Sequence, residues 1–436
     1  MRELVSRNRD LILIFILWYV FSLTAGSAFT SIFILFCLIL FKLKSNYKAI
    51  FFGLITIIIM SDSRAGALTY TSSLKVIYVL AMIAFLFLDK DRFQPLSEYY
   101  KPFLPFFAFS IPLIFLNPTP FSSFQRAISY NLIFFIIPNY FLVCFKEEGE
   151  QFLKDLICFL CLVLLISIII IPIYREDILF INGRYNGLLG NPNGMGLYVS
   201  LLFIFHYITD QLFPNLFSRQ EKILNFSLIL FSIFYCGSRN AIITIFIFYA
   251  FIRFFKISYV LGVISMLLIV LLKDLIGDFM LYLVDAFGLS EFYRVENVDK
   301  GSGRLIAWIF GWENVQENFF FGRGFNYTNY LYRLNFDKLA RLGHQGNAHN
   351  SYLTIWLDTG IIGLILLLRG LFLSYIRVFN VSPLFLPALL SILFSMFFES
   401  WFAASLNPFM FQVIGISLLG VVYNQKNEMD NNIIVS

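Results

Sequence analysis

The segment GHQGNAHN at residues 343–350, followed by SYLTIWLDTGIIGLILLL at residues 351–368, joins a polar, glycine-flanked stretch to an apolar run. The apolar run is about 18 residues long, close to the length that a helix needs to cross a bilayer. Two of the three histidines of the chain, His344 and His349, lie in the polar stretch. Histidine exchanges protons readily near neutral pH, so this boundary is a predicted place for chemistry at a membrane face.

Composition assigns the whole chain to the membrane class. Hydrophobic residues make up 59% of the 436 residues, and the chain has 55 phenylalanines. This content lies far outside the range of soluble domains. Apolar runs recur between short polar breaks, and we predict an all-α polytopic membrane protein with about 12–14 transmembrane helices. The expected spans cover residues 11–25, 28–41, 47–60, 65–88, 103–117, 127–145, 155–173, 191–208, 223–236, 240–252, 257–272, 350–368, 383–399 and 408–424.

These spans divide the chain into regions. We expect N-terminal transmembrane helices in residues 1–150, central helices with arginine-bearing outer loops in 151–272, one long extracytoplasmic loop with short helices in 273–349, C-terminal helices in 350–424 and a cytoplasmic tail in 425–436.

The long loop contains a predicted amphipathic helix. Four apolar residues stand at helical spacing, and Ser302 before them is a candidate cap. They are Leu305, Trp308, Trp312 and Val315. We expect this stripe to lie on the membrane surface or over a cavity mouth, and the helix to end in turns at Gly322 and Gly324.

Basic residues of the short loops orient the helices, because cytoplasmic loops carry an excess of Lys and Arg. Arg2, Arg7 and Arg9 place the N-terminus in the cytoplasm, and alternate loops carry further cations. These are Lys42, Lys44, Lys48, Lys90, Arg92, Lys101, Lys146, Lys154, Arg219, Lys222, Arg253, Lys256, Arg369 and Arg377. Both termini are therefore expected to be cytoplasmic, and the first apolar run is interpreted as an uncleaved signal anchor.

The opposite loops carry arginines that this rule does not explain. They are Arg64, Arg126, Arg175, Arg184, Arg239, Arg304, Arg323, Arg333 and Arg341. Arg64, Arg126 and Arg239 are expected at the N-terminal ends of inward-running helices, where the helix dipole favours negative charge. We therefore predict an anion site for a phosphate or pyrophosphate. The alternative for any single arginine is contact with a lipid headgroup.

The segment RYNGLLGNPNG (184–194) has the pattern of a shaped loop that ends in a helix. Asn191 is a good N-cap, and Pro192 suits the first helical position. Later, CGSRN (236–240) is short enough to form a tight connection that carries Arg239.

The cysteines and acidic residues indicate neither a redox site nor a metal site. All five cysteines lie in apolar runs, where the Cys158-x-x-Cys161 spacing is interpreted as core filling. The D-x-D sequence at Asp89 and Asp91 is interpreted as a solvated charge cluster. Acidic and basic residues nearly balance in the long loop, so a nucleic-acid partner is not expected.

Two charges fall inside the expected spans. Lys75 and Asp358 lie eleven and nine residues inward from Arg64 and His349, which puts both about 13–17 Å below the outer face. We hypothesise that they neutralise each other, because isolated charges at that depth are costly. Glu399, at the outer end of a span, is left open as a second acid or a sugar-binding group.

Several of these motifs, taken in order, resemble the O-antigen ligase and polymerase superfamily. They are Arg184 to Asn193, Ser238-Arg239, Gly303-Arg304-x-x-x-Trp308, Gly322-x-Gly324, Ala348-His349-Asn350-x-Tyr352-Leu353 and Gly360-x-x-Gly363. The resemblance covers about residues 180–420, and residues 1–150 match only as generic membrane helices.

The resemblance implies an inverting, metal-independent glycosyl transfer without a cofactor, at the outer face of a bacterial inner membrane. The donor would be a polyprenyl-pyrophosphate-linked glycan. His349 would be the general base, and Arg239 and Arg304 would complete the catalytic core. The residues expected to bind substrate are Arg184, Arg64, Arg126, Asn193, Arg323 and Asn350. His344 is expected to assist or to be solvated, and His206 is expected to be structural.

The acceptor stays open between a lipid A-core sugar, which defines a ligase, and a second lipid-linked repeat, which defines a polymerase. A protein acceptor is a further alternative. We favour the ligase because the histidine motif is well formed. A transporter of lipid-linked oligosaccharide is the alternative from another class. The chain shows no repeat relating its halves, and a transporter has little use for a long outer loop ending in a histidine motif.

Overall fold

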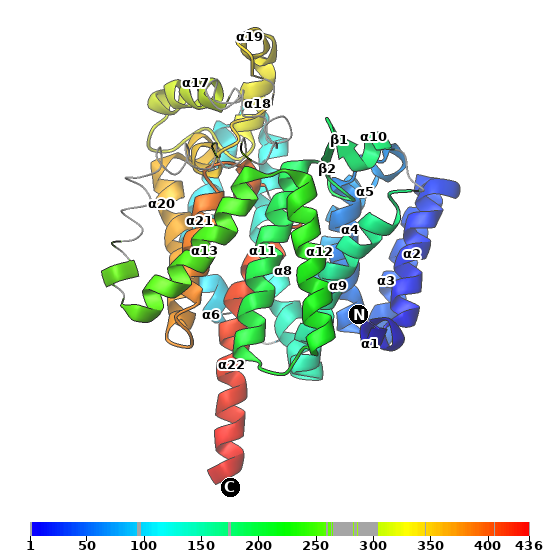
Figure 1. The fold of residues 1–436 in the computed structure, drawn as a ribbon. Coiled ribbons are helices and arrows are strands. Elements are labelled where there is room, and N and C mark those ends of the chain that lie inside the picture. Colours follow the sequence, from blue (N-terminus) through cyan, green and yellow to red (C-terminus); the bar gives the residue numbers. More distant parts are fainter. Residues whose placement is uncertain are drawn as a thin grey trace. The chain divides into compact units, whose positions relative to one another are not determined.

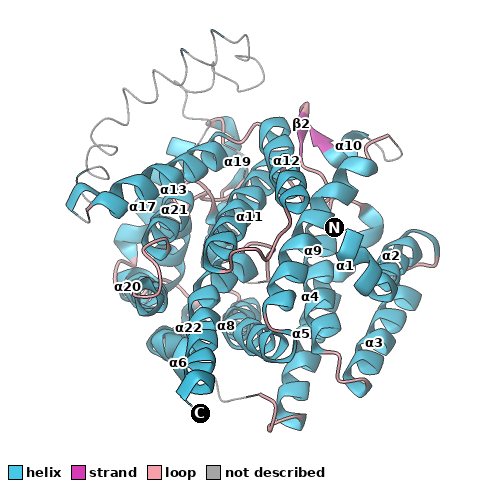
Figure 2. Ribbon diagram, turned by 60° about the horizontal axis from the view of Figure 1, so that its bottom comes forward, coloured by secondary structure: helices cyan, strands magenta, loops and turns pink. Residues whose placement is uncertain are grey.

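The computed structural model is built almost entirely of helices (Figure 1). It describes residues 2–93, 97–172, 176–258, 260–262, 264, 282, 286, 304–344, 346–404 and 406–435. The described strands, β1 (Phe180–Ile181) and β2 (Arg184–Tyr185), form one antiparallel pair, with β2 near α10 (Glu176–Leu179) in Figure 2. Because the described residues outside this pair of two-residue strands form helices and their connections, the prediction of an all-α architecture is confirmed.

The chain forms two compact units, each assembled from segments that are distant in sequence. Unit 1 comprises Met1–Ser97, Leu132–Ser238 and Leu406–Ser436, and unit 2 comprises Glu98–Asn131 and Arg239–Ser405. The helix α8 (Pro120–Glu148) supplies its first turns to unit 2 and the remainder to unit 1.

Unit 1 is organised around a buried helix, α11 (Pro192–Leu212), which packs against α9, α12 and α22. Apolar side chains on all sides of α11 are buried, including Tyr198 and Phe205. The other helices of unit 1 are α1 (Arg2–Arg7), α2 (Arg9–Thr24), α3 (Ser27–Leu43), α4 (Tyr47–Asp62), the 3-10 helix η1 (Gly66–Leu68), α5 (Thr71–Leu88), α9 (Glu150–Ile169), α10, α12 (Arg219–Cys236) and α22 (Met410–Val435).

Unit 2 is organised around α20 (Ser351–Phe379), which packs against α7, α17, α18, α21 and two 3-10 helices, η2 and η6. Its other elements are α6 (Ser97–Tyr100), which begins at the unit boundary, η2 (Lys101–Phe103), α7 (Leu104–Ser110), η3 (Pro112–Leu116), α13 (Arg239–Ile257), α17 (Arg304–Glu317), α18 (Tyr327–Leu334), α19 (Phe336–Arg341), α21 (Phe385–Ser395) and η6 (Ser400–Ala403). Figure 1 shows α17, α18 and α19 gathered at one end of α20.

Four helical stretches among the described residues are long and apolar enough to cross a membrane. They are Gly66–Leu88, Pro120–Glu148, Glu150–Ile169 and Ser351–Phe379. Helices also occur at most other expected spans. The helix expected over 103–117 is present as the short apolar stretch Lys101–Leu116, which is divided into η2, α7 and η3. Pro102, Pro105 and Pro112 remove backbone donors and favour the divisions. The span expected at 257–272 falls largely outside the described residues.

The amphipathic helix expected in the long loop is present as α17. Val315 is buried, whereas Leu305 and Trp312 are 58% and 43% exposed, and the expected contact of this stripe with a membrane surface or a cavity mouth stays a prediction. Ala307 and Phe310 take the inner positions, in a small core shared with α18, α19 and the first turns of α20. The cap proposed at Ser302 lies outside the described residues.

The helix α20 is interrupted at Gly360, whose φ of 67° and ψ of 178° are not helical. The segment Phe319–Gly324, called the inserted segment below, packs against this break. A Cβ atom at Gly322 would lie only 2.6 Å from the backbone nitrogen of Gly360. Both glycines are therefore required for the two backbones to meet, and the expected glycine turns also have this packing role.

Backbone hydrogen bonds join the inserted segment to the interrupted helix. The amides of Arg323 and Gly324 donate to the carbonyl oxygens of Leu357 and Asp358 at 3.1 and 2.7 Å. The carbonyl groups at the break are therefore hydrogen-bonded. Backbone that is not helical needs such partners wherever water is absent, as it would be inside a bilayer.

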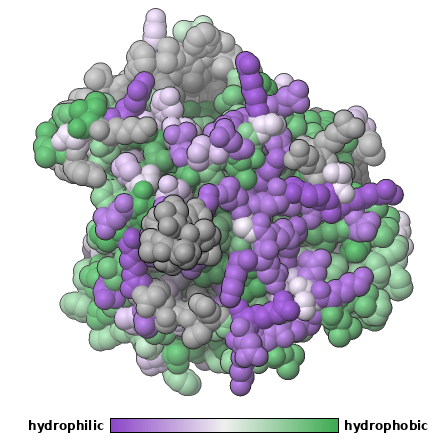
Figure 3. Space-filling view, turned by 90° about the horizontal axis from the view of Figure 1, so that it is seen from below, coloured by the Kyte–Doolittle hydropathy of each residue, from purple (hydrophilic) through white to green (hydrophobic). Residues whose placement is uncertain are grey.

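Ion pairs gather at one end of the helices of unit 1, where Figure 3 shows hydrophilic side chains on the face seen from below. Asp155 is 1% exposed and is contacted by Arg7 at 2.8 Å and Lys48 at 3.2 Å. The side chain of Asn8 also donates to this carboxylate, at 3.0 Å. These cations belong to the set that predicts the cytoplasmic side.

Candidate functional site

His349 lies in the turn that precedes α20. Its φ of 45° is in the left-handed region, which is uncommon for a residue other than glycine. The Asn347 side chain accepts the His349 amide at 3.0 Å, and Asn350 caps the helix by accepting the Leu353 amide at 3.0 Å. The side chains of Asn347 and Asn350 therefore stabilise a turn that places the imidazole of His349 just before the first residue of the helix.

The imidazole of His349 lies beside a carboxylate that is also paired with an arginine. His349 Nδ1 is 3.3 Å from Glu399 Oε2, and Arg304 Nη2 is 2.8 Å from Glu399 Oε1. The side chains of His349, Glu399 and Arg304 are 32%, 17% and 23% exposed, so all three are partly shielded and still reachable from outside. Glu399 therefore joins two residues that the sequence motifs select as catalytic.

The position of Glu399 follows from hydrogen bonds between the start of α20 and the segment that leads into η6. The Ser351 hydroxyl donates to the Glu399 carbonyl oxygen at 2.6 Å, and the Asn350 amide donates to the Ser400 hydroxyl at 3.0 Å. The Phe402 amide in turn donates to the Ser351 hydroxyl at 3.2 Å. Residues about 50 positions apart are thus held together by hydrogen bonds between serine hydroxyls and backbone groups, independently of the pair that they position.

The other edge of the imidazole faces a glycine. A Cβ atom at Gly346, where φ is 134°, would lie 3.1 Å from His349 Nε2. The turn is held from α17 by Trp308, whose indole N–H donates to the Ala348 carbonyl oxygen at 2.9 Å. His344 is buried, and its Nε2 lies 3.1 Å from the Asn347 carbonyl oxygen. His344 therefore supports the turn. Of the two alternatives predicted for His344, the solvated side chain is wrong, and assistance to His349 stays a prediction.

This geometry suits a general base. In the neutral imidazole one nitrogen carries the proton and the other has a lone pair. If Nδ1–H donates to Glu399, the lone pair is on Nε2 and can accept a proton from a hydroxyl group. The carboxylate would also stabilise the imidazolium that forms, and Arg304 keeps that carboxylate in place.

The other predicted arginines of unit 2 have differing environments. Arg239 is exposed and is the first residue of α13, as expected. Arg126 donates to the Asn326 side chain at 2.8 Å. Its predicted place at a helix N-terminus is wrong, because α8 already begins at Pro120. The guanidinium of Arg323 lies 5.9 Å from the centre of the Tyr327 ring, beside the inserted segment.

Asp358 has partners other than the one predicted. Its carboxylate accepts the backbone amides of Asn326 and Thr328 at 2.9 and 2.8 Å, and the Thr328 hydroxyl at 2.7 Å. Lys75 donates to the Ser61 hydroxyl and the Leu406 carbonyl oxygen, each at 3.2 Å. Asp358 is therefore satisfied by Thr328 and by the backbone that follows the inserted segment, and its pairing with Lys75 stays a prediction.

In unit 1, Arg184 is held in the loop that the sequence singles out. Its Nε donates to the Cys236 carbonyl oxygen and its Nη2 to the Asn193 side chain, each at 2.9 Å. Asn191 caps α11 by accepting the Gly194 amide at 2.7 Å, which confirms the predicted cap. Arg64 is exposed between α4 and η1. Arg175 lies outside the described residues.

The remaining histidine and the cysteines are buried, and a structural role for them stays a prediction. His206 is fully buried, with Nε2 3.1 Å from the Asn225 side chain and its ring stacked on Phe217. All five cysteines are buried free thiols.

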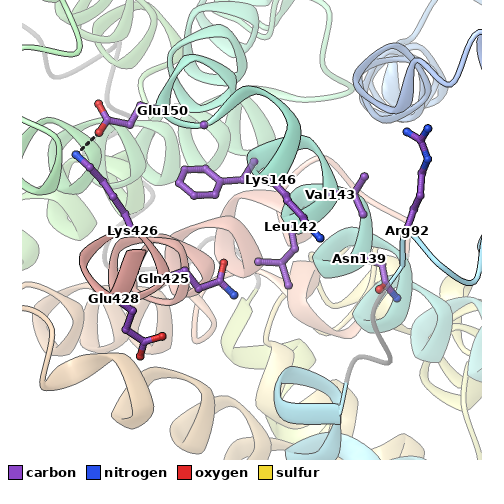
Figure 4. Close-up of a pocket in the computed structure, with 11 residues that line it drawn as sticks. Arg92, Asn139, Leu142, Val143, Lys146, Glu150, Gln425, Lys426 and Glu428 are labelled. Atoms are coloured by element: carbon purple, nitrogen blue, oxygen red, sulfur yellow. Dashed lines mark hydrogen bonds and ion pairs between the residues drawn. The ribbon is translucent and has the colours of Figure 1, made fainter. Parts of the chain in front are cut away.

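Unit 1 also has a pocket of about 590 Å³, which is lined by apolar and by charged side chains (Figure 4). Its lining includes Arg92, Asn139 and Lys146, and Figure 4 shows Lys426 paired with Glu150 at its edge. None of the predicted site residues lines this pocket.

In a comparison with known families, residues 224–368 match a family model described as O-antigen ligase, and this range contains Arg239, Arg304 and His349. Curated proteins include no match to the chain.

Proposed function

The chain belongs to the O-antigen ligase and polymerase superfamily, and from this premise we propose that it is a membrane glycosyltransferase. It transfers a glycan from a polyprenyl-pyrophosphate donor to an acceptor hydroxyl, with inversion and without a metal ion. The observation that carries the proposal is the arrangement of Arg304, Glu399 and His349, which provides an oriented base beside a cation.

The proposed step is a direct displacement. The acceptor oxygen attacks the anomeric carbon and forms the new glycosidic bond, while the bond from that carbon to the pyrophosphate oxygen breaks. The electron pair leaves with the polyprenyl pyrophosphate, and the acceptor proton moves to Nε2 of His349. Glu399 holds the imidazole in the required tautomer and stabilises its charged form.

Arginines are the natural partners of the leaving pyrophosphate, because a guanidinium is always charged and can donate two parallel hydrogen bonds. Among the described residues, the hydrogen bonds of Arg304 go to Glu399 through Nη2, which leaves Nε and Nη1 for a phosphate oxygen. We extend the donor-binding role to Arg239 and Arg184, with Arg64, Arg126 and Arg323 as further candidates. Asn193 and Asn350 act through Arg184 and the helix cap, respectively.

A ligase that uses a lipid A-core acceptor is the first proposal, at the outer face of a bacterial inner membrane. A repeat-unit polymerase of the same superfamily is the second, since both reactions need the same base and the same leaving group. Glycans from a deletion strain distinguish them by mass. Full-length polymer left on the polyprenyl carrier indicates a ligase, and single repeats on the acceptor indicate a polymerase.

Reconstitution tests the enzyme against the transporter. The purified protein in lipid nanodiscs, mixed with a polyprenyl-pyrophosphate glycan and an acceptor in the presence of EDTA, should yield glycosylated acceptor of inverted anomeric configuration. Free polyprenyl pyrophosphate should appear in equal amount. A protein that moves the donor across liposomes and forms no new glycosidic bond would contradict the proposal.

A further inference from the structure

Unit 1 contains an apolar crevice of about 300 Å³ between α2, α4 and α9. Its lining includes Ile16 of α2, Thr56 of α4 and a row of residues from Phe159 of α9 to Ile170, which directly follows α9. At 1.5 Å per residue this row extends about 16 Å. The lining is therefore long enough to contact several isoprene units of a hydrocarbon chain.

One end of the crevice lies at the loop that follows Arg184. Leu188 of this loop lines the crevice, and its amide donates to the Ser167 hydroxyl near the end of α9 at 3.3 Å. The Gly190 amide donates to the Asp62 carboxylate at the end of α4 at 3.1 Å. Two of the helices that form the crevice thus also fix the loop.

The same loop carries a cation at its start. Arg184 lies on β2 just before the loop, and its guanidinium donates a hydrogen bond to the side chain of Asn193, just after the loop. An apolar crevice that leads to a fixed, arginine-bearing loop matches a molecule with one long hydrocarbon chain and an anionic head.

We propose that this crevice binds the polyprenyl chain of the donor, with the pyrophosphate toward the Arg184 loop. The inference rests on the proposed function, because that function supplies the donor. A polyprenyl pyrophosphate has one chain, which fits a single crevice, whereas a phospholipid has two chains attached to one headgroup.

Photo-crosslinking locates the chain without requiring turnover. A polyprenyl pyrophosphate with a diazirine in mid-chain is added to the protein in nanodiscs, irradiated, and the labelled peptides are identified by mass spectrometry. Labels are expected on the stretches that line the crevice, Ile12–Tyr19 of α2 and Phe159–Ile170. An excess of unlabelled polyprenyl pyrophosphate should reduce the labelling, and an excess of phosphatidylglycerol should leave it unchanged. Equal labelling by a diazirine phosphatidylglycerol, or labels confined to other helices, would overturn the inference.

A matched pair of variants tests the crevice through kinetics. Ile16 and Leu13 are both on α2 and are 45% and 46% exposed, but only Ile16 lines the crevice. Ile16→Trp should raise the KM of a long-chain donor by roughly three- to tenfold, a modest change because the displaced chain enters lipid instead of water. The KM of a two-isoprene donor should not change, and Leu13→Trp should change neither.

The outcomes separate the two proposals. Specific labelling of the crevice without any glycan transfer would retain the lipid site and reject the proposed function. Normal transfer, with equal kinetics in Ile16→Trp and Leu13→Trp, would retain the function and reject the crevice.

Discussion

Nδ1 of His349 lies 3.3 Å from Oε2 of Glu399. His349 lies just before α20 and Glu399 lies just before η6, and hydrogen bonds join these two segments. The contact between His349 and Glu399 gives the imidazole a defined orientation, so that Nε2 can accept the proton of a hydroxyl group. Arg304 completes the arrangement from α17 by its contact with the other carboxylate oxygen.

Replacing the carboxylate should lower the rate more than the affinity. Glu399→Gln keeps the side-chain size but removes the charge that pairs with Arg304 and stabilises an imidazolium. We expect kcat to fall by about 10²- to 10⁴-fold with the donor KM little changed. Steady-state transfer kinetics provide the measurement. The exposed acid Glu313 of α17 is the control, and an equal loss in Glu313→Gln would argue for a general charge effect.

A methyl group beside the base should also reduce activity. In Gly346→Ala the added carbon would lie 3.1 Å from His349 Nε2, so the imidazole must move. We expect kcat to fall by about tenfold or more, because small displacements of a reacting group are costly. Gly343→Ala is the matched control, since Gly343 also has a positive φ, of 92°, but has open space around it. Similar losses in both variants would indicate backbone strain instead of crowding.

The contact between the inserted segment and the break in α20 should contribute measurably to the stability of the protein. Gly322→Ala places a Cβ atom 2.6 Å from the Gly360 nitrogen at a positive φ of 64°. We expect a loss of about 2–4 kcal/mol, measured by thermal unfolding in detergent. Gly149→Ala has a φ of 61° and no neighbour within 4 Å, so it should cost only about 1 kcal/mol. Equal losses would mean that the close packing contributes little.

Several features of the site follow from local sequence, and others do not. The cap at Asn191 and the turn around His349 are predictable, because side-chain preferences at helix ends act over three or four residues. Asn350, one of the residues predicted to bind substrate, caps α20 by the same local rule. The role of Glu399 is not predictable in this way, since hydrogen bonds across 50 positions bring it to His349.

Charges inside the spans show the same limit. Depth along a helix suggests Lys75 as a partner for Asp358, but the carboxylate is satisfied by backbone amides of Asn326 and Thr328. A periodic sequence pattern does not identify these amides as partners of Asp358, because they reach the carboxylate only through the way the inserted segment meets the break at Gly360. The all-α architecture needed only composition and apolar periodicity, whereas the broken stretch at 103–117 depended on its prolines.

Acid should weaken the cap of α12. Burial alone would raise the pKa of Glu221, which precedes the span expected at 223–236, but the Ser218 amide and the Lys154 ammonium lower it from 4.5 to about 2. A depressed folded-state pKa stabilises the fold above the unfolded value, and this contribution is lost as the pH falls from about 4.5 to 2. Glu221→Gln should therefore lower Tm at pH 7 and have progressively less effect below pH 4. A Tm difference that persists unchanged at pH 2.5 would contradict this assignment.

The most direct test of the central claim is the rate of glycan transfer by His349→Asn in nanodiscs. Asparagine tolerates the positive φ of 45° at this position, so the turn should persist, but it cannot accept the proton. We predict that transfer falls by at least about 10³-fold while labelling by the polyprenyl-pyrophosphate photoprobe is retained. Transfer at the wild-type rate in this variant would show that His349 is not the base.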